Sequence, residues 1–201
     1  MADDIQGAAR ADFCRFLAAC YYEPDPSFVE EGLFDSMAGV ASHVDGVLEE
    51  ASVRLGEAFA ADRPEDLLVD YTRLFLGPVD APARPYGCVW LGTGSTLMQD
   101  STQAVLSLYE EAGFDLSEDF RDLPDHVAAE LEFLYLLLHR ENGGPPGAGE
   151  ARRLKARFLD EHLGRWADPF TEAVETHART RFYRELAVLT RRFIAAETGR
   201  A

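Results

Sequence analysis

His126 and Glu130, one helical turn apart, have the residue types and the spacing that acid–base chemistry needs. A histidine can act as a general base when a neighbouring carboxylate orients its imidazole ring. Side chains at positions i and i+4 share one face of a helix, so these two groups could meet. The same spacing is more often structural, with a histidine at a helix start bonded to a nearby acid. We favour the structural interpretation of this pair.

Other motifs that carry catalysis or bind cofactors are missing from the sequence. It contains no GxxxxGK(S/T) phosphate loop, no HExxH or ExxH pair and no GxSxG nucleophile elbow. The stretch Gly92-Thr93-Gly94 lacks the further glycine and the preceding strand of a dinucleotide site. None of the five histidines pairs with a cysteine at the spacing of metal ligands. We therefore predict no catalytic residue, no metal site and no cofactor, and an enzyme is the minority interpretation.

The charge of the chain is strongly negative and unevenly distributed. The formal net charge is −17. Residues 1–149 carry 28 acidic side chains, 8 arginines and no lysine, whereas residues 150–201 carry 11 basic and 8 acidic side chains. Binding to nucleic acid needs a basic face, so we predict no nucleic-acid partner. The negative field would attract a basic partner, although acidity alone is more simply explained by solubility.

The cysteine content and the hydropathy pattern predict a cytoplasmic protein. Cys14, Cys20 and Cys88 form no CxxC pair and are odd in number, which argues against a disulfide framework. The N-terminal sequence MADDIQGAAR lacks the basic and apolar regions of a secretory signal. No apolar run approaches about 18 residues, so we predict no membrane span.

Residues 70–91, DYTRLFLGPVDAPARPYGCVWL, form the stretch around which we expect the other elements to be arranged. It begins as the end of an amphipathic helix, breaks at Gly77-Pro78 and continues through a loop stiffened by prolines. It ends in an apolar and aromatic group. A long loop within a compact chain is more often functional than accidental. Its apolar side chains should either plug the core or line a surface that a partner covers.

Hydrophobic periodicity predicts helices along the whole chain. The helix that follows Leu123-Pro124 is apolar on two sides and should therefore lie centrally. The segment 142–149, NGGPPGAG, is a candidate hinge. The sequence predicts an all-α fold, a single helical domain over residues 1–201. Its nine or so helices are expected at about 8–22, 26–37, 44–61, 64–75, 95–112, 123–140, 152–163, 168–177 and 180–196.

Three segments in this order, DYTRLFLGP, RPYGCVWL and LPDHVAAELEFL, resemble the TorD/DmsD/NarJ family of redox-enzyme maturation chaperones. The C-terminal helices resemble that family too, so the similarity extends over about residues 10–196. The resemblance implies a TorD-like, all-helical cytoplasmic chaperone without a bound metal. It further implies binding to the twin-arginine signal peptide, and sometimes the body, of a molybdopterin oxidoreductase precursor. Such binding would hold the precursor until its cofactor is inserted and assembly is complete.

The resemblance also implies a set of peptide-binding positions. We expect the apolar members to supply affinity and the acidic field, with Asp125 closest, to attract the basic end of the peptide. The chain departs from the family pattern at Asp70, where a glutamate is usual, and at Gly87 and Cys88, which replace a glutamate and a serine. The expected peptide-binding residues are Tyr71, Leu74, Phe75, Pro85, Tyr86, Val89, Trp90, Asp125, His126 and Glu130.

Two other functions and two oligomeric states stay open on the sequence. A nucleotide-dependent GTP switch is one alternative, although the chain lacks a phosphate loop. A structural helical subunit of an oxidoreductase complex is the other. Family members can exchange helices, so the chain is expected to be a monomer or a helix-swapped homodimer. The sequence does not name the client oxidoreductase.

Overall fold

The computed structural model describes residues 2–77, 80–92, 100–117 and 120–199, and this part of the chain is built from helices. The all-α prediction is confirmed, because the described ranges contain helices and no strand. The one β-type pairing in these ranges is an isolated bridge between Tyr86 and His126. The predicted break at Gly92-Thr93-Gly94 and the predicted helix start at residue 95 fall partly outside these ranges. The described helices are α1 (Ala2–Ala19), α2 (Ser27–Glu30), α3 (Leu33–Ala41), α4 (Gly46–Ala61), α5 (Pro64–Tyr71), the π-helical turn η1 (Thr72–Leu76), α6 (Gly87–Leu91), α7 (Asp100–Ala112), α8 (Val127–Asn142), α9 (Ala148–Phe158), the π-helical turn η2 (Leu159–Leu163), α10 (Gly164–His177) and α11 (Arg181–Glu197).

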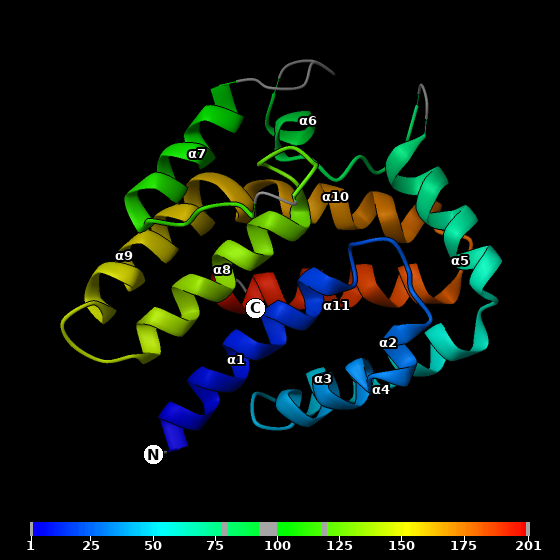
Figure 1. Cartoon of the computed structure of the whole chain (residues 1–201), viewed down its shortest axis with the longest axis horizontal. Helices are drawn as coiled ribbons and strands as arrows, with labels where there is room; N and C mark the ends of the chain where they lie inside the picture. The colour runs from blue at the N-terminus through cyan, green and yellow to red at the C-terminus, as the bar shows by residue number, and fades with distance from the viewer. Residues whose placement is uncertain (1, 78–79, 93–99, 118–119, 200–201) are drawn as a thin grey trace.

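Helix α8 is the central element of the fold, as the sequence predicts. It packs against α1 on one side and α9 on the other, and Figure 1 shows it running between them. Leu131, Phe133 and Leu134 are all fully buried, because the helix turns apolar side chains towards both neighbours. The loop that precedes α8 carries the LPDH motif, so the central helix fixes the position of that motif.

Local signals explain where several helices begin and end. The Asp45 carboxylate accepts hydrogen bonds from the backbone N–H groups of Val47 and Leu48 and so caps α4. Pro64 occupies the first turn of α5, where its missing N–H has no partner to lose. Gly32 adopts a left-handed conformation with φ of 67° and separates α2 from α3. The single helix predicted over residues 26–37 is therefore two helices.

The start predicted for a helix at Asp168-Pro169 is wrong. Pro169 lies inside α10, which begins at Gly164 and follows η2 without a break. In the turn where the proline contributes no N–H, the Thr171 hydroxyl donates to the carbonyl oxygens of Ala167 and Asp168, at 2.7 and 3.0 Å. Packing of the apolar face of α10 against α11 holds the helix together across the proline.

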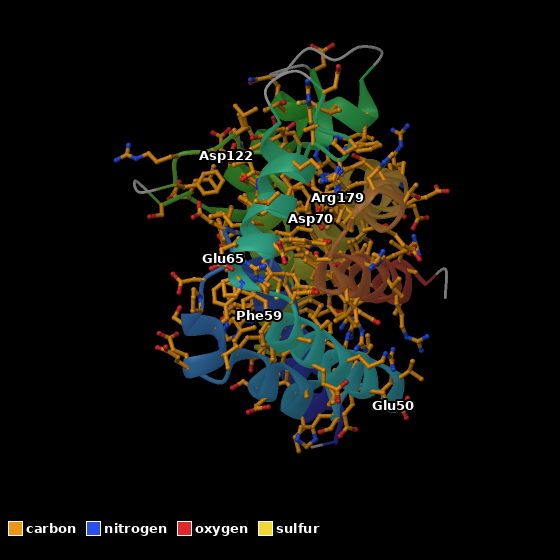
Figure 2. All side chains as sticks on the ribbon, turned by 90° about the vertical axis from the view of Figure 1, so that its right-hand side faces the viewer. Glu50, Phe59, Glu65, Asp70, Asp122 and Arg179 are labelled. Carbon is orange, nitrogen blue, oxygen red and sulfur yellow. The ribbon has the colours of Figure 1, made fainter. Side chains whose placement is uncertain are left out.

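Helix α11 is capped by acidic side chains from distant parts of the chain. The Asp70 Oδ2 atom accepts hydrogen bonds from the backbone N–H groups of Arg179 and Thr180, each at 2.8 Å. The Asp62 Oδ2 atom accepts another from Phe182 N at 2.9 Å. Figure 2 shows Asp70 and Arg179 next to each other at this helix end. Asp70, one of the departures from the family pattern, therefore has a structural role.

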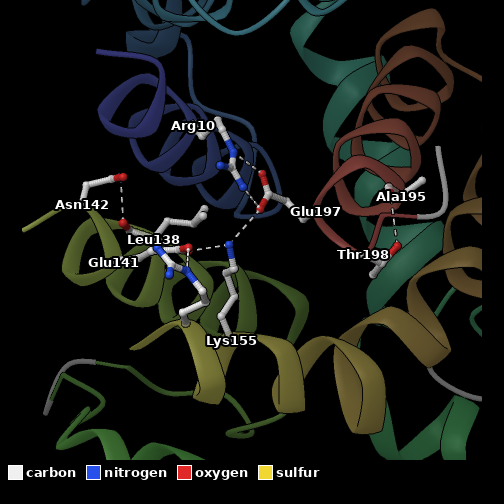
Figure 3. A network of polar contacts seen from close by, with 9 residues as sticks. Arg10, Leu138, Glu141, Asn142, Lys155, Ala195, Glu197 and Thr198 are labelled. Atoms are coloured by element: carbon white, nitrogen blue, oxygen red, sulfur yellow. Dashed lines mark hydrogen bonds and ion pairs between the residues drawn. The ribbon is translucent and has the colours of Figure 1, made fainter. Parts of the chain in front are cut away.

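A network of ion pairs joins the first and last helices (Figure 3). The Lys155 Nζ atom on α9 lies 2.5 Å from Glu141 on α8 and 3.6 Å from Glu197 on α11. Arg10 on α1 pairs with the same Glu197 carboxylate. The ion pair between Glu141 and Lys155 therefore joins α8 to α9 on either side of their connecting loop. Whether residues 142–149 act as a hinge stays a prediction.

No helix in the described ranges is both long enough and apolar enough to cross a membrane.

Candidate functional site

The two strongest family motifs lie side by side. The backbone N–H of Gly87 donates to the carbonyl oxygen of Asp125, and that of Val127 donates to the carbonyl oxygen of Pro85, both at 2.8 Å. This pairing fixes Tyr86 beside His126, with ring centroids 5.6 Å apart. The RPYGCVWL and LPDH segments therefore form one unit, although about forty residues separate them in the sequence.

His126 caps the central helix and does not pair with the Glu130 side chain. Its Nδ1 atom accepts a hydrogen bond from the backbone N–H of Ala128 at 3.1 Å, which requires that nitrogen to be unprotonated. Burial lowers the pKa of His126 and so favours the neutral ring. The Nε2 atom faces Asp122 at 3.9 Å. The predicted pairing of His126 with Glu130 is wrong, whether for catalysis or for structure.

Glu130 instead forms a buried cluster with residues from η2 and α10. Its Oε1 atom lies 2.7 Å from His162 Nε2, and its Oε2 atom accepts a hydrogen bond from Trp166 Nε1 at 3.0 Å. Burial raises the pKa of the fully buried Glu130. Burial alone would lower the pKa of His162, but the Glu130 carboxylate outweighs it and raises that pKa. Glu130 is therefore a structural residue that no peptide can touch in this conformation.

Gly87 is explained by the same cluster. A Cβ atom at this position would lie 3.0 Å from Glu130 Oε1, 3.0 Å from His162 Nε2 and 3.1 Å from Trp166 Nε1. Such distances are tighter than most Cβ contacts, so a side chain at this position would require Glu130, His162 or Trp166 to shift by a few tenths of an ångström, which glycine avoids. The glycine that departs from the family pattern at position 87 therefore lies where Glu130, His162 and Trp166 leave little room for a side chain.

Asp125 is buried, which contradicts the expectation that it lies at an acidic rim. Its Oδ2 atom accepts hydrogen bonds from the backbone N–H of Cys88 at 2.8 Å and from the Thr102 hydroxyl at 3.1 Å. The carboxylate therefore stabilises the first turn of α6 and joins it to α7. A group with no exposed surface cannot form a direct ion pair with a peptide.

The expected apolar surface is mostly core. Leu74, Phe75 and Tyr71 are buried, and the Phe75 ring contacts the rings of Tyr71, Tyr183 and Phe170. Their side chains cannot line an open groove, because aromatic rings from α10 and α11 surround them. Pro85 is buried as well, whereas half-buried positions are occupied by Tyr86, Val89 and Trp90.

An open cavity of about 470 Å³ lies directly beside the paired motifs. Its walls come from the turn after α1, the loop before α8 and α8 itself. We call it the acidic-aromatic pocket, because it combines two carboxylates with two aromatic rings, and Figure 2 shows Asp122 at the surface of this region. The lining residues are Tyr22, Leu116, Ser117, Phe120, Arg121, Asp122 and Glu132.

His126 of the paired motifs contacts the aromatic walls of this pocket. The His126 ring centroid lies 6.4 Å from that of Tyr22 and 6.4 Å from that of Phe120. The Tyr22 hydroxyl donates to Glu132 Oε1 at 2.7 Å. Burial, together with this hydrogen bond, raises the pKa of Tyr22, and burial and a hydrogen bond to Asp122 likewise raise that of Tyr86. Both phenols are therefore protonated near neutral pH.

The arrangement is suited to a cation, in particular a planar guanidinium. The carboxylates of Asp122 and Glu132, which outnumber the one lining cation Arg121, can accept its N–H groups, while the faces of Tyr22 and Phe120 can stack on its plane. Sequence reasoning did not identify these lining residues. Asp122 and Phe120 stand just before the LPDH motif, which was an available signal, but Tyr22 and Glu132 are joined only by the fold. Within the described ranges, no group of three or more His, Cys, Asp or Glu side chains could hold a metal ion.

Comparison with known proteins identifies the class of the chain. Residues 42–172 match the family model described as nitrate reductase delta subunit. The chain is 30% identical over 190 residues to the Tat proofreading chaperone DmsD of Salmonella typhi, covering 92% of this chain and 89% of the relative. It is 26% identical over 124 residues to the chaperone protein TorD of Photobacterium profundum, covering 61% and 57%. These relatives are chaperones and not catalytic enzymes.

A solved structure agrees on the fold. A protein of Archaeoglobus fulgidus, assigned to the redox enzyme maturation proteins, superposes with a TM-score of 0.58 at 21% identity, covering 92% of this chain and 93% of the other. The fold is all-helical, and the family model and the curated relatives define the class as a maturation chaperone. The chain belongs to the TorD/DmsD/NarJ family, whose model bears the nitrate reductase delta subunit description.

Proposed function

We propose that the protein is a cytoplasmic chaperone that binds the twin-arginine signal peptide of a molybdopterin oxidoreductase precursor. It holds that precursor until cofactor insertion and assembly are complete. Membership of the family and the similarity to a Tat proofreading chaperone support this role. The acidic-aromatic pocket is the single observation that carries the proposal, because it offers an arginine side chain both carboxylates and ring faces.

The chemistry of the pocket favours arginine over lysine. Asp122 and Glu132 can accept N–H groups from different edges of one guanidinium, and Tyr22 or Phe120 can stack on its face. The Tyr22 hydroxyl already fixes the Glu132 carboxylate, so less freedom is lost when the peptide arrives. Tyr86 and His126 act from beneath the pocket by holding Asp122 and the aromatic walls in place.

The energy of this contact is modest. An exposed ion pair contributes about 0.2–1 kcal/mol and an exposed cation–π contact about 0.5–1 kcal/mol. A micromolar complex needs about 8 kcal/mol of net binding free energy. The pocket therefore selects the arginine, and most of the affinity comes from apolar contacts elsewhere along the same peptide.

Removing both carboxylates from the pocket tests the proposal. Asp122→Asn combined with Glu132→Gln should weaken binding of a twin-arginine peptide by about 1 kcal/mol, roughly fivefold. Titration calorimetry measures the change. Glu50→Gln is the matched control, because Glu50 is exposed on α4 and lies at the far end of the molecule in Figure 2. Equal affinities of the double variant and the unchanged protein would contradict the proposal.

A further inference from the structure

A second hollow lies between the start of α2, the end of α4 and the start of α5. Its volume is about 310 Å³, and an adjoining hollow of about 250 Å³ shares Val29 and Ala60 with it. We call the two together the apolar groove. Apolar side chains make up much of the lining of the larger hollow: Val29 and Ala60 are exposed, Phe59 and Leu67 are largely buried, and Pro24 and Pro64 also contribute.

The apolar groove is preformed and exposes apolar surface to solvent. Three tilted aromatic rings pack together beside it, with the Phe59 centroid 5.8 Å from that of Phe28 and 5.0 Å from that of Phe34. Pro24 and Pro64 stiffen the two ends of the wall. Val29 is 52% exposed although it is apolar, and nothing in the described part of the chain covers it. A preformed apolar hollow of this kind suits an apolar segment of another chain.

The apolar groove and the acidic-aromatic pocket adjoin the same short segment of chain. Tyr22 lines the pocket and Pro24 lines the groove, so their Cα atoms are at most about 7 Å apart. Figure 2 shows Asp122 of the pocket, Phe59 of the groove and Glu65 along one side of the molecule. A few extended residues of a peptide would span from one hollow to the other.

The charges around the apolar groove complement a basic peptide. Four of the groove's lining residues carry carboxylates: Glu30 and Asp62 in the larger hollow, and Asp35 and Glu57 in the smaller one. None of the described lining residues is basic, and the nearby Arg63 lies within 4 Å of both Glu65 and Asp66. The face is therefore strongly negative, and it attracts a segment that carries arginines beside an apolar run.

We propose that the apolar groove binds the apolar segment that follows the paired arginines, while the acidic-aromatic pocket binds an arginine. The two hollows then recognise one peptide in two parts, on either side of residues 22–24. This inference rests on the proposed function and extends it to a second surface. It also assigns the affinity to the groove, where Val29 and Ala60 are exposed, in place of the buried Leu74 and Phe75.

The test combines two peptides with variants of the protein. One labelled peptide carries two arginines followed by an apolar segment, and the other carries the same arginines followed by a Gly-Ser segment of equal length. Ala60→Trp fills the groove, since Ala60 is exposed and lines both hollows. Fluorescence anisotropy should show that the unchanged protein binds the apolar peptide much more tightly than the Gly-Ser peptide, and that Ala60→Trp weakens binding of the apolar peptide about tenfold.

A polar substitution in the groove and a matched one outside it show whether the loss of binding comes from the groove itself. Val29→Asn should also weaken the apolar peptide, whereas Val53→Asn, at a 48% exposed valine on α4 outside the groove, should not. Thermal melting of each variant confirms that it is folded. If Ala60→Trp and Val29→Asn bind the apolar peptide normally while Asp122→Asn with Glu132→Gln weakens it, the groove is excluded and the proposed function stands. If neither peptide binds the unchanged protein, the proposed function itself is contradicted.

Discussion

At the scale of single residues, most positions shared with the family motifs act from inside the protein. Asp125 stabilises the start of α6, Glu130 holds His162 and Trp166, and His126 caps α8. None of the three lines the acidic-aromatic pocket, and His126 lies beside its walls at Tyr22 and Phe120. A substitution among them would change binding through the position of the walls, and so it would also change stability.

The fit of Gly87 against the buried cluster can be tested directly. Gly87→Ala should lower the free energy of unfolding by about 1–3 kcal/mol, because its methyl group would press on Glu130 and His162. Urea denaturation measures the change. Gly39→Ala on α3 is the matched control, since a Cβ there meets nothing within 4 Å. That control should be stabilised by about 0.4–1 kcal/mol. Equal effects at the two positions would contradict the tight fit.

At the scale of elements, helix ends are fixed by side chains from elsewhere in the chain. Asp70 lies in the last turn of α5, and its carboxylate caps α11, which begins more than a hundred residues later. Burial alone would raise the pKa of Asp70, but hydrogen bonds from Thr180 and Arg73 outweigh it and lower that pKa. The ionised carboxylate therefore couples the two helices.

This coupling predicts a particular pH dependence. Because the folded pKa of Asp70 lies below the unfolded value, its contribution is complete above about pH 4 and disappears as the pH falls through the folded pKa. Asp70→Asn should therefore cost about 1–2 kcal/mol of unfolding free energy at pH 7, with the difference closing in acid. Denaturation at several pH values measures it, with the exposed Asp35→Asn as control. A difference that persists unchanged in acid would contradict the role of the charge.

The helices could be predicted well from sequence, because hydrophobic periodicity is a local property. The central position of α8 and the proline at the start of α5 are both confirmed. The errors arose where tertiary contacts determine the helix boundaries. Pro169 stays helical because α10 packs on α11, and residues 87–91 form the short helix α6 because Asp125 caps them.

The candidate site was only partly predictable. The structure brings the motifs around Tyr86 and Asp125 together, and their role in peptide binding stays a prediction. Which way their side chains point depends on partners that the local sequence does not reveal: Phe75 is covered by rings from α10 and α11. Tyr22 and Glu132 meet across 110 residues of sequence, so no local pattern could pair them.

At the scale of the whole molecule, the uneven distribution of charge should affect how fast a basic peptide binds. The excess of acids lies in residues 1–149, which contain both hollows. A field of this kind accelerates the encounter with a basic peptide more than it strengthens the complex. The apolar contacts, which salt screens little, then govern how long the peptide stays.

Salt should therefore act mainly on association. Raising the ionic strength from about 0.01 to 0.15 M shortens the screening length from about 30 to 8 Å, so the association rate constant of a twin-arginine peptide should fall severalfold. The dissociation rate constant should change little. Stopped-flow fluorescence measures both, and a peptide with the arginines replaced by glutamine is the control. A salt effect confined to dissociation would contradict steering by the acidic face.

The central claim is that an arginine of a signal peptide lies in the acidic-aromatic pocket. Photo-crosslinking tests it most directly, with a photoreactive residue placed next to the second arginine and the linked residues mapped by mass spectrometry. We predict crosslinks to Tyr22, to Glu132 and to the loop that carries Asp122. Crosslinks that instead concentrate on the outer faces of α9 and α11, with none at the pocket, would contradict the account.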